Sequence, residues 1–474
     1  MSMSHTRFYQ LISLLCMSLA GCTVPATIPG NAPQPGHWLP ADETPAQASI
    51  RSGPMPAHWW QGFASAQLDT LMARSLQHNR DLETARASLA EAHQVWLASA
   101  DSQWPQTDLQ ADAGRQKYGQ ALFGPVNFVI PPFSYVEAGP TISWTADLSG
   151  RQRASEARAR ALADHEQHRL DATWLMISQQ IAMLCFDLAE AKDEQTLQRQ
   201  MTEIDRHLQD LVRESRRAGA ATRPDETAAS ARLDADQAAL PALEQRISLD
   251  RHALAMLLGA TPDQQALPPF HLADFTLPDS PVSLPSALVH RRPDILAAEA
   301  SLQAAGAAWG YARASHYPDI TLSAQWLQEA LTPAGLFHAA NAAWALGAGI
   351  DLPLADGGQR DAQTEAARQA MLAARSQYQQ IVLDAFRQVA DQLTALDHDR
   401  QLAATRHRSL LTSQEQLDMD RFRVQTGDAG LLPELTAQRA LLEAQINELR
   451  ARQAGLRDSA ALLVSLGGSR LPAQ

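Results

Sequence analysis

The residues of this chain that could do chemistry are its 15 histidines and three cysteines, and their spacing argues against catalysis. His165, His168 and His398 lie in helix-forming stretches, and none joins a cysteine or carboxylate at the spacing that holds a metal ion. The sequence also contains no glycine-rich phosphate loop and no nucleophile elbow. We therefore predict a protein that is not an enzyme and has no metal site and no cofactor.

Covalent chemistry is predicted at one residue, Cys22. A short apolar run, Leu11–Leu19, fits a secretion signal because it is too short to span a bilayer as a mature helix. It ends in Leu19-Ala20-Gly21-Cys22, which resembles the lipobox of bacterial lipoproteins, where cleavage leaves the cysteine N-terminal and acylated. We predict a signal peptide over residues 1–21 and a lipid on Cys22. The alternative is an ordinary signal peptide with a chance cysteine.

The mature N-terminus is predicted to be an extended tether, residues 22–57, because residues 23–57 hold eight prolines. An aspartate directly after Cys22 would resemble an inner-membrane retention signal. Thr23 stands at that position instead, and this favours the outer membrane. Cys185 is then the only thiol left besides Cys22, so no intrachain disulfide is expected. Cys185 lies in an apolar helical stretch and is predicted to be a small core residue.

The composition excludes one class of partner and favours helices. Acidic residues outnumber basic ones by 52 to 39, and the net charge of −13 argues against a nucleic-acid binder, which needs a basic face. Apolar residues make up 45% of the chain and aromatic residues only 6%. Beyond the signal, no apolar run approaches the length of a membrane helix, so a membrane crossing would have to use strands.

The chain is predicted to be an internal duplication. Asp81 and the residues after it match Asp294 and its followers, 213 positions later, and the glycines from Gly150 onward recur 208 positions later. We predict repeat 1 over 58–270 and repeat 2 over 271–474. Each repeat contains a short helix, a β-hairpin, a long helix and a return helix.

Four strands of about ten residues are predicted, because apolar residues alternate there with polar or small ones. The stretches are 107–113, 136–145, 320–326 and 344–352. This is the length and pattern of transmembrane strands that face lipid on one side and water on the other. A soluble sheet packed on a helix would alternate in the same way.

The helices decide between these two interpretations of the strands. Residues 151–218 and 359–426 are each 68 residues long and contain neither proline nor glycine. Each could form a helix of about 100 Å, which no compact domain holds. Gly219 and Gly427 are predicted to end these helices in tight turns, after which the chain returns in shorter coiled-coil helices. The fold class is therefore mainly α with a small β part.

Oligomerisation follows from the number of strands. Four strands cannot close a barrel, and an open sheet edge cannot lie in lipid. Three copies would supply twelve strands around a pore wide enough for solutes, whereas two copies would supply eight, which side chains would fill. We predict a homotrimer in which the long helices continue the barrel as a tube into the periplasm.

Several stretches, together with this architecture, resemble the TolC-type outer membrane factors, in the lipoprotein branch often called NodT-type. They are Trp59-Trp60-Gln61-Gly62-Phe63, Arg291-Arg292-Pro293-Asp294-Ile295, His316-Tyr317-Pro318-Asp319-Ile320, Leu352-Pro353-Leu354 with Asp356-Gly357-Gly358, and Leu466-Gly467-Gly468. The resemblance implies an export duct in the outer membrane that docks on a periplasmic adaptor protein and an inner-membrane pump. It implies drugs or other toxic small molecules as cargo. The alternatives are a type I protein-secretion duct and a periplasmic coiled-coil adaptor or structural lipoprotein.

The resemblance also implies a gate at the periplasmic tip turns, Gly219 and Gly427, where carboxylate or apolar rings close the tube. Pro433 and Thr436 stand where relatives have ring aspartates, Ala429 where some have a linking arginine and Val424 where they have tyrosine. We therefore expect a constriction built from Leu432, with Glu434 nearby and Asp225 bonded to an arginine such as Arg423. The alternative for Asp225 is that it complements a helix N-terminus.

The arginines that open the second repeat are also candidates for a contact between chains. Arg291 and Arg292 precede Pro293 and Asp294, which suit the first turn of a helix. The two arginines could pair with carboxylates of a neighbouring chain. The interpretation that we favour is that the motif only starts a helix.

Overall fold

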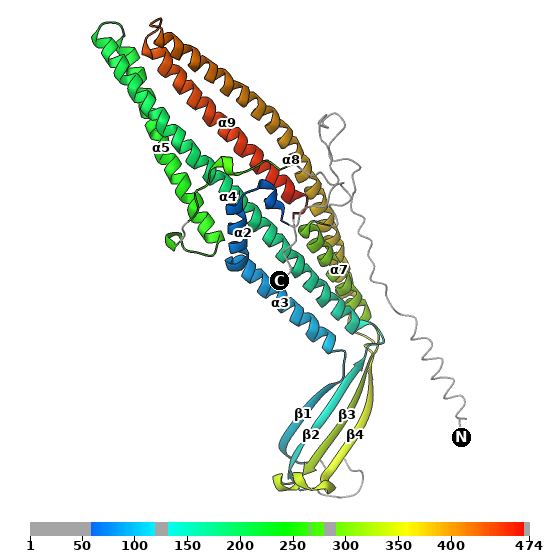
Figure 1. Cartoon of the computed structure of the whole chain (residues 1–474). Coiled ribbons are helices and arrows are strands. Elements are labelled where there is room, and N and C mark those ends of the chain that lie inside the picture. Colours follow the sequence, from blue (N-terminus) through cyan, green and yellow to red (C-terminus); the bar gives the residue numbers. More distant parts are fainter. Residues whose placement is uncertain (1–57, 119–130, 265–266, 279–290, 469–474) are drawn as a thin grey trace. The chain divides into compact units, whose positions relative to one another are not determined.

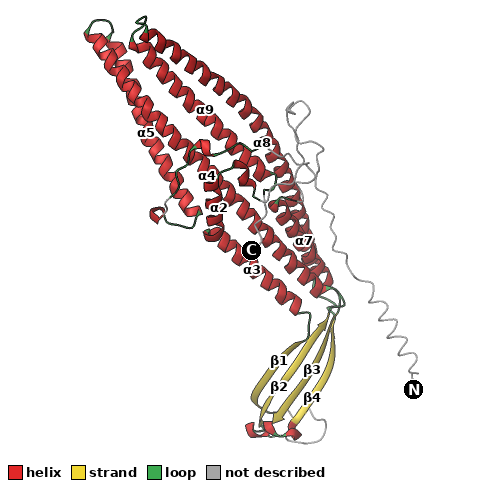
Figure 2. Ribbon diagram, viewed as in Figure 1, coloured by secondary structure: helices red, strands yellow, loops and turns green. Residues whose placement is uncertain are grey.

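The computed structural model describes residues 58–118, 131–264, 267–278 and 291–468, and these residues are mainly helical (Figure 2). The predicted signal peptide, the tether and the lipid site at Cys22 lie outside the described residues. The elements, in chain order, are η1 (Trp59–Phe63), α2 (Ala66–His78), α3 (Arg80–Asp101), β1 (Gln106–Gln116), β2 (Phe133–Ala146), α4 (Arg151–Arg217), α5 (Arg223–Leu257), η3 (Pro262–Gln264), η4 (Leu272–Asp274), α7 (Pro293–Ala314), β3 (Asp319–Ala330), η5 (Pro333–Phe337), η6 (Ala339–Asn341), β4 (Ala342–Asp351), α8 (Gln359–Gln425) and α9 (Leu431–Ser465).

The described residues fall into two compact units, and each unit draws on both halves of the chain. The first unit contains residues 89–166 and 298–378, which include the whole sheet. The second contains 58–88, 167–297 and 379–468, which include α5, α9 and the greater part of α4 and α8. The division in space therefore does not follow the predicted division along the chain.

The first unit holds an antiparallel sheet in the order β1-β2-β3-β4 (Figure 2). Its register places apolar residues side by side, because Ile142 pairs with Ala324, Ala324 with Leu346 and Trp326 with Trp344. The opposite face carries polar pairs such as Asp112 with Glu137 and Glu137 with Glu329. The alternation in the sequence thus becomes one apolar and one polar face across all four strands.

The long helices have matching lengths. Both α4 and α8 have 67 residues, and both α5 and α9 have 35. The helix α8 begins 208 positions after α4, and α9 begins 208 positions after α5. Each long helix continues without interruption because its stretch contains neither proline nor glycine. The helix α4 ends two residues before Gly219, and α8 ends two residues before Gly427.

The second unit packs an aromatic cluster against α4. Trp59 donates its indole N–H to the hydroxyl of Ser178 at 3.1 Å, and Trp60 meets Trp174 edge to face. Phe63 contacts Phe186, which adjoins Cys185 in the chain. Cys185 is fully buried, and burial raises the pKa of its thiol well above the usual range, which confirms it as a small core residue.

One stretch of α4 is long and apolar enough to cross a membrane, judged by length and composition alone. The sequence analysis expected no apolar run of that length beyond the signal. More than half of this stretch is buried inside the protein. The core of a soluble helical unit produces the same signal, because its buried face is apolar whether or not lipid is present.

Candidate functional site

The two helical hairpins of the second unit end in glycine turns, which are the predicted tip turns. Gly219 has φ +80° and Gly427 has φ +77°, a region that residues with a Cβ rarely adopt. Gly219 N–H donates to the carbonyl of Arg216 at 3.0 Å, and Gly427 N–H donates to that of Val424 at 3.1 Å. Both turns therefore satisfy the carbonyls at the end of a long helix and reverse the chain within a few residues.

Asp225 caps the start of α5. Its carboxylate accepts the backbone N–H of Thr222 at 2.8 Å and the Thr222 hydroxyl at 2.6 Å. These bonds hold the pKa of Asp225 below its usual range, with the hydroxyl bond as the larger cause. The expected bond from Asp225 to Arg423 is not formed within the chain, where Arg423 pairs with Asp420 at 3.2 Å, one turn back on α8. Local capping satisfies both residues within their own helices.

The remaining gate candidates separate into two places. A recess of about 530 Å³ lies between the two tips, and both Asp225 and Leu432 line it. Leu432 is 48% exposed there. Glu434 instead faces Arg421 across its own hairpin at 3.6 Å. The structure therefore brings together Asp225 and Leu432 but neither Glu434 nor Arg423.

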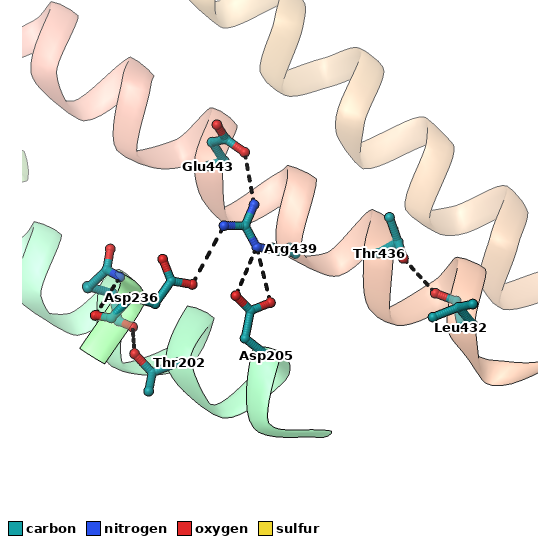
Figure 3. A network of polar contacts seen from close by, with 8 residues as sticks. Thr202, Asp205, Asp236, Leu432, Thr436, Arg439 and Glu443 are labelled. Atoms are coloured by element: carbon teal, nitrogen blue, oxygen red, sulfur yellow. Dashed lines mark hydrogen bonds and ion pairs between the residues drawn. The ribbon is translucent and has the colours of Figure 1, made fainter. Parts of the chain in front are cut away.

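A buried polar network that the sequence analysis missed adjoins this recess, and one of its members, Asp205, lines it (Figure 3). Arg439 of α9 donates to both carboxylate oxygens of Asp205 of α4, at 3.1 and 3.2 Å. It also faces Asp236 of α5 at 3.6 Å and Glu443 at 3.3 Å. Burial, together with the neighbouring Asp236, raises the pKa of Asp205 to about 6 despite the arginine. The stripe of α4 that contains Asp205 also buries Glu194, Gln198 and Thr202, so a run of polar residues on one helix face was the available signal.

Two further arginines of α9 reach carboxylates of α4. Arg450 donates to Glu194 at 2.6 Å, and Arg457 bonds to Asp187. The carboxylates follow at steps of seven and eleven residues along α4, and the arginines step back by the same numbers along α9. Three pairs in step fix the antiparallel register of the two helices.

Glu190 lies beside these pairs, and its side chain is only 1% exposed. It faces Arg246 of α5 at 2.8 Å, and Glu194 and Arg450 adjoin it. Burial and the hydrogen bond to Glu194 raise the pKa of Glu190 to about 8. The folded protein therefore holds a proton that the unfolded chain releases at a much lower pH.

This proton predicts a pH dependence of stability. Because the pKa of Glu190 is raised in the folded state, its contribution is fully present at low pH and is lost as the pH rises through about 8. We expect the free energy of unfolding to fall with a limiting slope of about 1.4 kcal/mol per pH unit between the ordinary pKa of 4.5 and about 8, and to level off above that, where Glu190 is deprotonated in both states. Glu190→Gln should remove this slope, measured by circular dichroism melts at intervals from about pH 5 to about pH 9. The matched control is Glu365→Gln on the exposed surface of α8, and an unchanged slope in Glu190→Gln would contradict the assignment.

Arg292, a candidate for a contact between chains, has its partners within its own chain. Its guanidinium bonds to Asp294 at 2.6 and 3.0 Å, to the carbonyl of Ser465 at 3.0 Å and to Gln388 at 2.9 Å. These partners come from α7, α9 and α8 of the same chain, and the side chain is almost fully buried. Arg292 therefore joins three helices of its own unit, which makes the motif a packing element.

The arrangement of the described residues supports passage or docking. Across the ranges that the structure describes, no group of three histidines, cysteines or carboxylates is placed to hold a metal ion. The polar groups instead pair between helices or cap helix ends. What the geometry presents is a sheet with an apolar face and a pair of hairpin tips around a recess.

Comparison with known proteins gives consistent results over nearly the whole chain. A family model described as outer membrane efflux protein matches residues 71–260 and again 284–468. The pyoverdine export outer membrane protein OpmQ of Pseudomonas aeruginosa is 29% identical over 466 residues, covering 96% of this chain and 95% of OpmQ. Nodulation protein T of Rhizobium leguminosarum bv. viciae is 27% identical over 465 residues, covering 95% and 93%. Among solved structures, the outer-membrane channel OprN matches with a TM-score of 0.82 and 26% identity, covering 95% of this chain and 99% of OprN.

Proposed function

This chain belongs to the outer membrane efflux protein family, and from that premise we propose that three copies form one closed export channel. Family membership makes the chain the outer membrane channel component of a tripartite efflux system. It is an outer membrane protein, and its long helical part is periplasmic. The proposal concerns how one chain becomes a channel.

The observation that carries the trimer is the open sheet. Among the described residues, β1 and β4 form the two ends of the strand order, so each leaves one edge of backbone N–H and C=O groups unpaired. Large apolar side chains on this sheet are exposed in the isolated chain, including Leu109, Trp344 and Leu346. An apolar face suits lipid, but free edges do not, because unpaired backbone groups in hydrocarbon cost several kcal/mol each. Neighbouring copies that pair β4 with β1 would satisfy both requirements.

We also propose that the chain is a duplication with repeats over 58–270 and 271–474. The equal helix lengths and the constant offset of 208 positions support it. So do the two separate matches of one family model, to 71–260 and to 284–468.

For partners and cargo we propose a periplasmic adaptor protein, an inner-membrane pump and small toxic molecules. OpmQ exports pyoverdine by its name, and two other relatives are named for solvent and toluene efflux, so the named cargoes are small molecules. A periplasmic coiled-coil adaptor would not need a four-stranded sheet with an exposed apolar face, so the sheet argues against that alternative. The cargo is proposed to pass without chemical change.

Assembly and conductance test the proposal together. Purified protein in mild detergent should have the mass of a trimer, migrate as a heat-modifiable band, and form ion-conducting pores in planar bilayers. A stable monomer whose strands are intact by circular dichroism would contradict it.

We propose that Cys22 carries the lipid anchor, although the barrel provides the main attachment. Acyl chains give marginal and reversible membrane binding, whereas a barrel buries a whole apolar belt. Cys22→Ala should therefore abolish acylation, measured by mass spectrometry, while the assembled protein stays in the outer membrane fraction. A soluble periplasmic Cys22→Ala protein would contradict the barrel.

We propose that the gate lies at the hairpin tips, with Leu432 as the constriction, Asp225 beside it in the recess, and Glu434 and Arg423 near the Gly427 turn as its further members. Leu432→Ser and Asp225→Ala should each raise the resting single-channel conductance several-fold, because threefold symmetry repeats each change around the axis. The control is Leu411→Ser, an equally exposed leucine farther up α8. Unchanged conductance in both tip variants would place the closure elsewhere.

A further inference from the structure

The helices of the second unit form a row in the order α5, α4, α9, α8 (Figure 1). An ion pair joins each two adjacent helices of the row. The pairs are Arg246 of α5 with Glu190 of α4, Arg439 of α9 with Asp205 of α4, and His407 of α8 with Glu448 of α9. The helices α5 and α8 therefore stand at the two ends of the row.

The contact between α4 and α9, here called the internal seam, is charged. It holds the three arginine–carboxylate pairs Arg457–Asp187, Arg450–Glu194 and Arg439–Asp205. The carboxylates of Glu194 and Asp205 are almost completely buried. A buried carboxylate needs its partner, so this face of α4 fits only a surface that brings arginines at the same steps.

Each helix of the internal seam has a counterpart in the other repeat, 208 positions away, and that counterpart lies at an end of the row. The counterpart of α4 is α8, and the counterpart of α9 is α5. The three carboxylate positions become Ala395, Leu402 and Ser413 of α8, and the three arginine positions become Leu249, Ala242 and Ala231 of α5. All six residues are uncharged. Leu249 is 58% exposed and Leu402 is 42% exposed in the isolated chain.

We propose that these two faces meet between copies of this chain, with α5 of one copy packed against α8 of the next in the register of the internal seam. This intersubunit seam would pair Leu249 with Ala395, Ala242 with Leu402 and Ala231 with Ser413. Two of the three pairs place a leucine against an alanine, so a large side chain meets a small one on each occasion. The proposal rests on the trimer proposed above and adds its register and its chemistry.

The difference in charge gives the seams their specificity. If α8 of a neighbour displaced α9 from α4, the carboxylates of Glu194 and Asp205 would be buried without a counter-charge. Such a buried charge without a partner is strongly unfavourable, whereas the six uncharged residues at the matching positions of α5 and α8 leave no charge unpaired when they meet each other. Each chain therefore keeps its own four helices together and offers only the ends of the row to its neighbours, which lets copies close into a ring.

Cross-linking between engineered cysteines tests the register. The double variants Leu249→Cys/Ala395→Cys and Ala231→Cys/Ser413→Cys are in register, whereas Leu249→Cys/Ser413→Cys recombines the same positions and is displaced by 18 residues, about 27 Å of helix. A short bis-maleimide, whose reach matches an arginine–carboxylate pair, is applied to the detergent-solubilised protein. Cys185 is fully buried and does not compete, and the four single-cysteine variants control for Cys22.

The in-register variants should give covalent dimers and trimers on denaturing gels, and the displaced variant should give monomers. Native mass spectrometry of the same samples separates the two proposals. If the protein is a trimer but the in-register variants do not cross-link, or the displaced variant does, the proposed intersubunit seam is wrong while the proposed trimeric channel stands. A monomeric preparation overturns the trimer itself. A link confined to monomers would place α5 against α8 of the same chain and would also overturn the seam.

Discussion

Gly139→Ala is expected to block assembly of the sheet, because backbone atoms of β3 occupy the space that a Cβ at Gly139 in β2 would need. A Cβ at Gly139 would lie 1.9 Å from the carbonyl oxygen of Trp326 and 2.8 Å from the Cα of Leu327. Both are backbone atoms and cannot turn aside as a flexible side chain could. The pairing of β2 with β3 is interrupted at Gly139 and at Pro140, which has no N–H to donate. The strands would have to separate at the junction between the two hairpins.

The expected cost is large because the variant must move backbone. Overpacking costs about 1–3 kcal/mol or more in each chain, and a trimer repeats it three times. We expect the yield of heat-modifiable, membrane-inserted protein to fall by about tenfold or more. Gly349→Ala is the matched control, since a Cβ at Gly349 in β4 meets nothing within 4 Å. Equal yields of the two variants would show that β2 and β3 do not pair in the assembled sheet as they do here.

Arg439→Ala is expected to give the largest loss of stability in the helical unit. It would leave Asp205, whose side chain is only 1% exposed, facing Asp236 without a counter-charge. Removing one partner of a buried ion pair costs about 3–5 kcal/mol. We expect a clear fall in the thermal midpoint of the helical signal, measured by circular dichroism in detergent.

The pH dependence of this loss distinguishes a lost ion pair from a lost packing contact. Burial already raises the pKa of Asp205 to about 6, so its charged form is disfavoured in the folded state. The loss in Arg439→Ala should therefore be greatest above that pH and smaller below it, where Asp205 takes up a proton. The control is Arg368→Ala, whose partner Glu365 lies 2.9 Å away on the exposed surface, and it should lose less than about 1 kcal/mol. A loss in Arg439→Ala that does not vary with pH would assign the effect to packing.

The sequence by itself determined the elements and their ends. Uninterrupted helix-forming stretches and the glycines that follow them placed α4 and α8 to within one residue, because a positive φ after a long helix demands glycine. Alternation with period two gave the two faces of each strand, since successive side chains of a strand point in opposite directions. The free edges of four strands also predicted, from the sequence, that copies of the chain pair with one another.

Only the tertiary structure decided which charged residue meets which. Arg439 and Asp205 are 234 positions apart, and nothing local to either residue marks the other as its partner. Arg292, a candidate for contact with a neighbouring chain, bonds to three helices of its own chain, and Asp225, expected to bond an arginine, caps α5. Periodicity within one element is a property of local backbone geometry, so it can be read along the chain. Partners in different elements depend on which helices are neighbours, and that is settled by the packing of the whole unit.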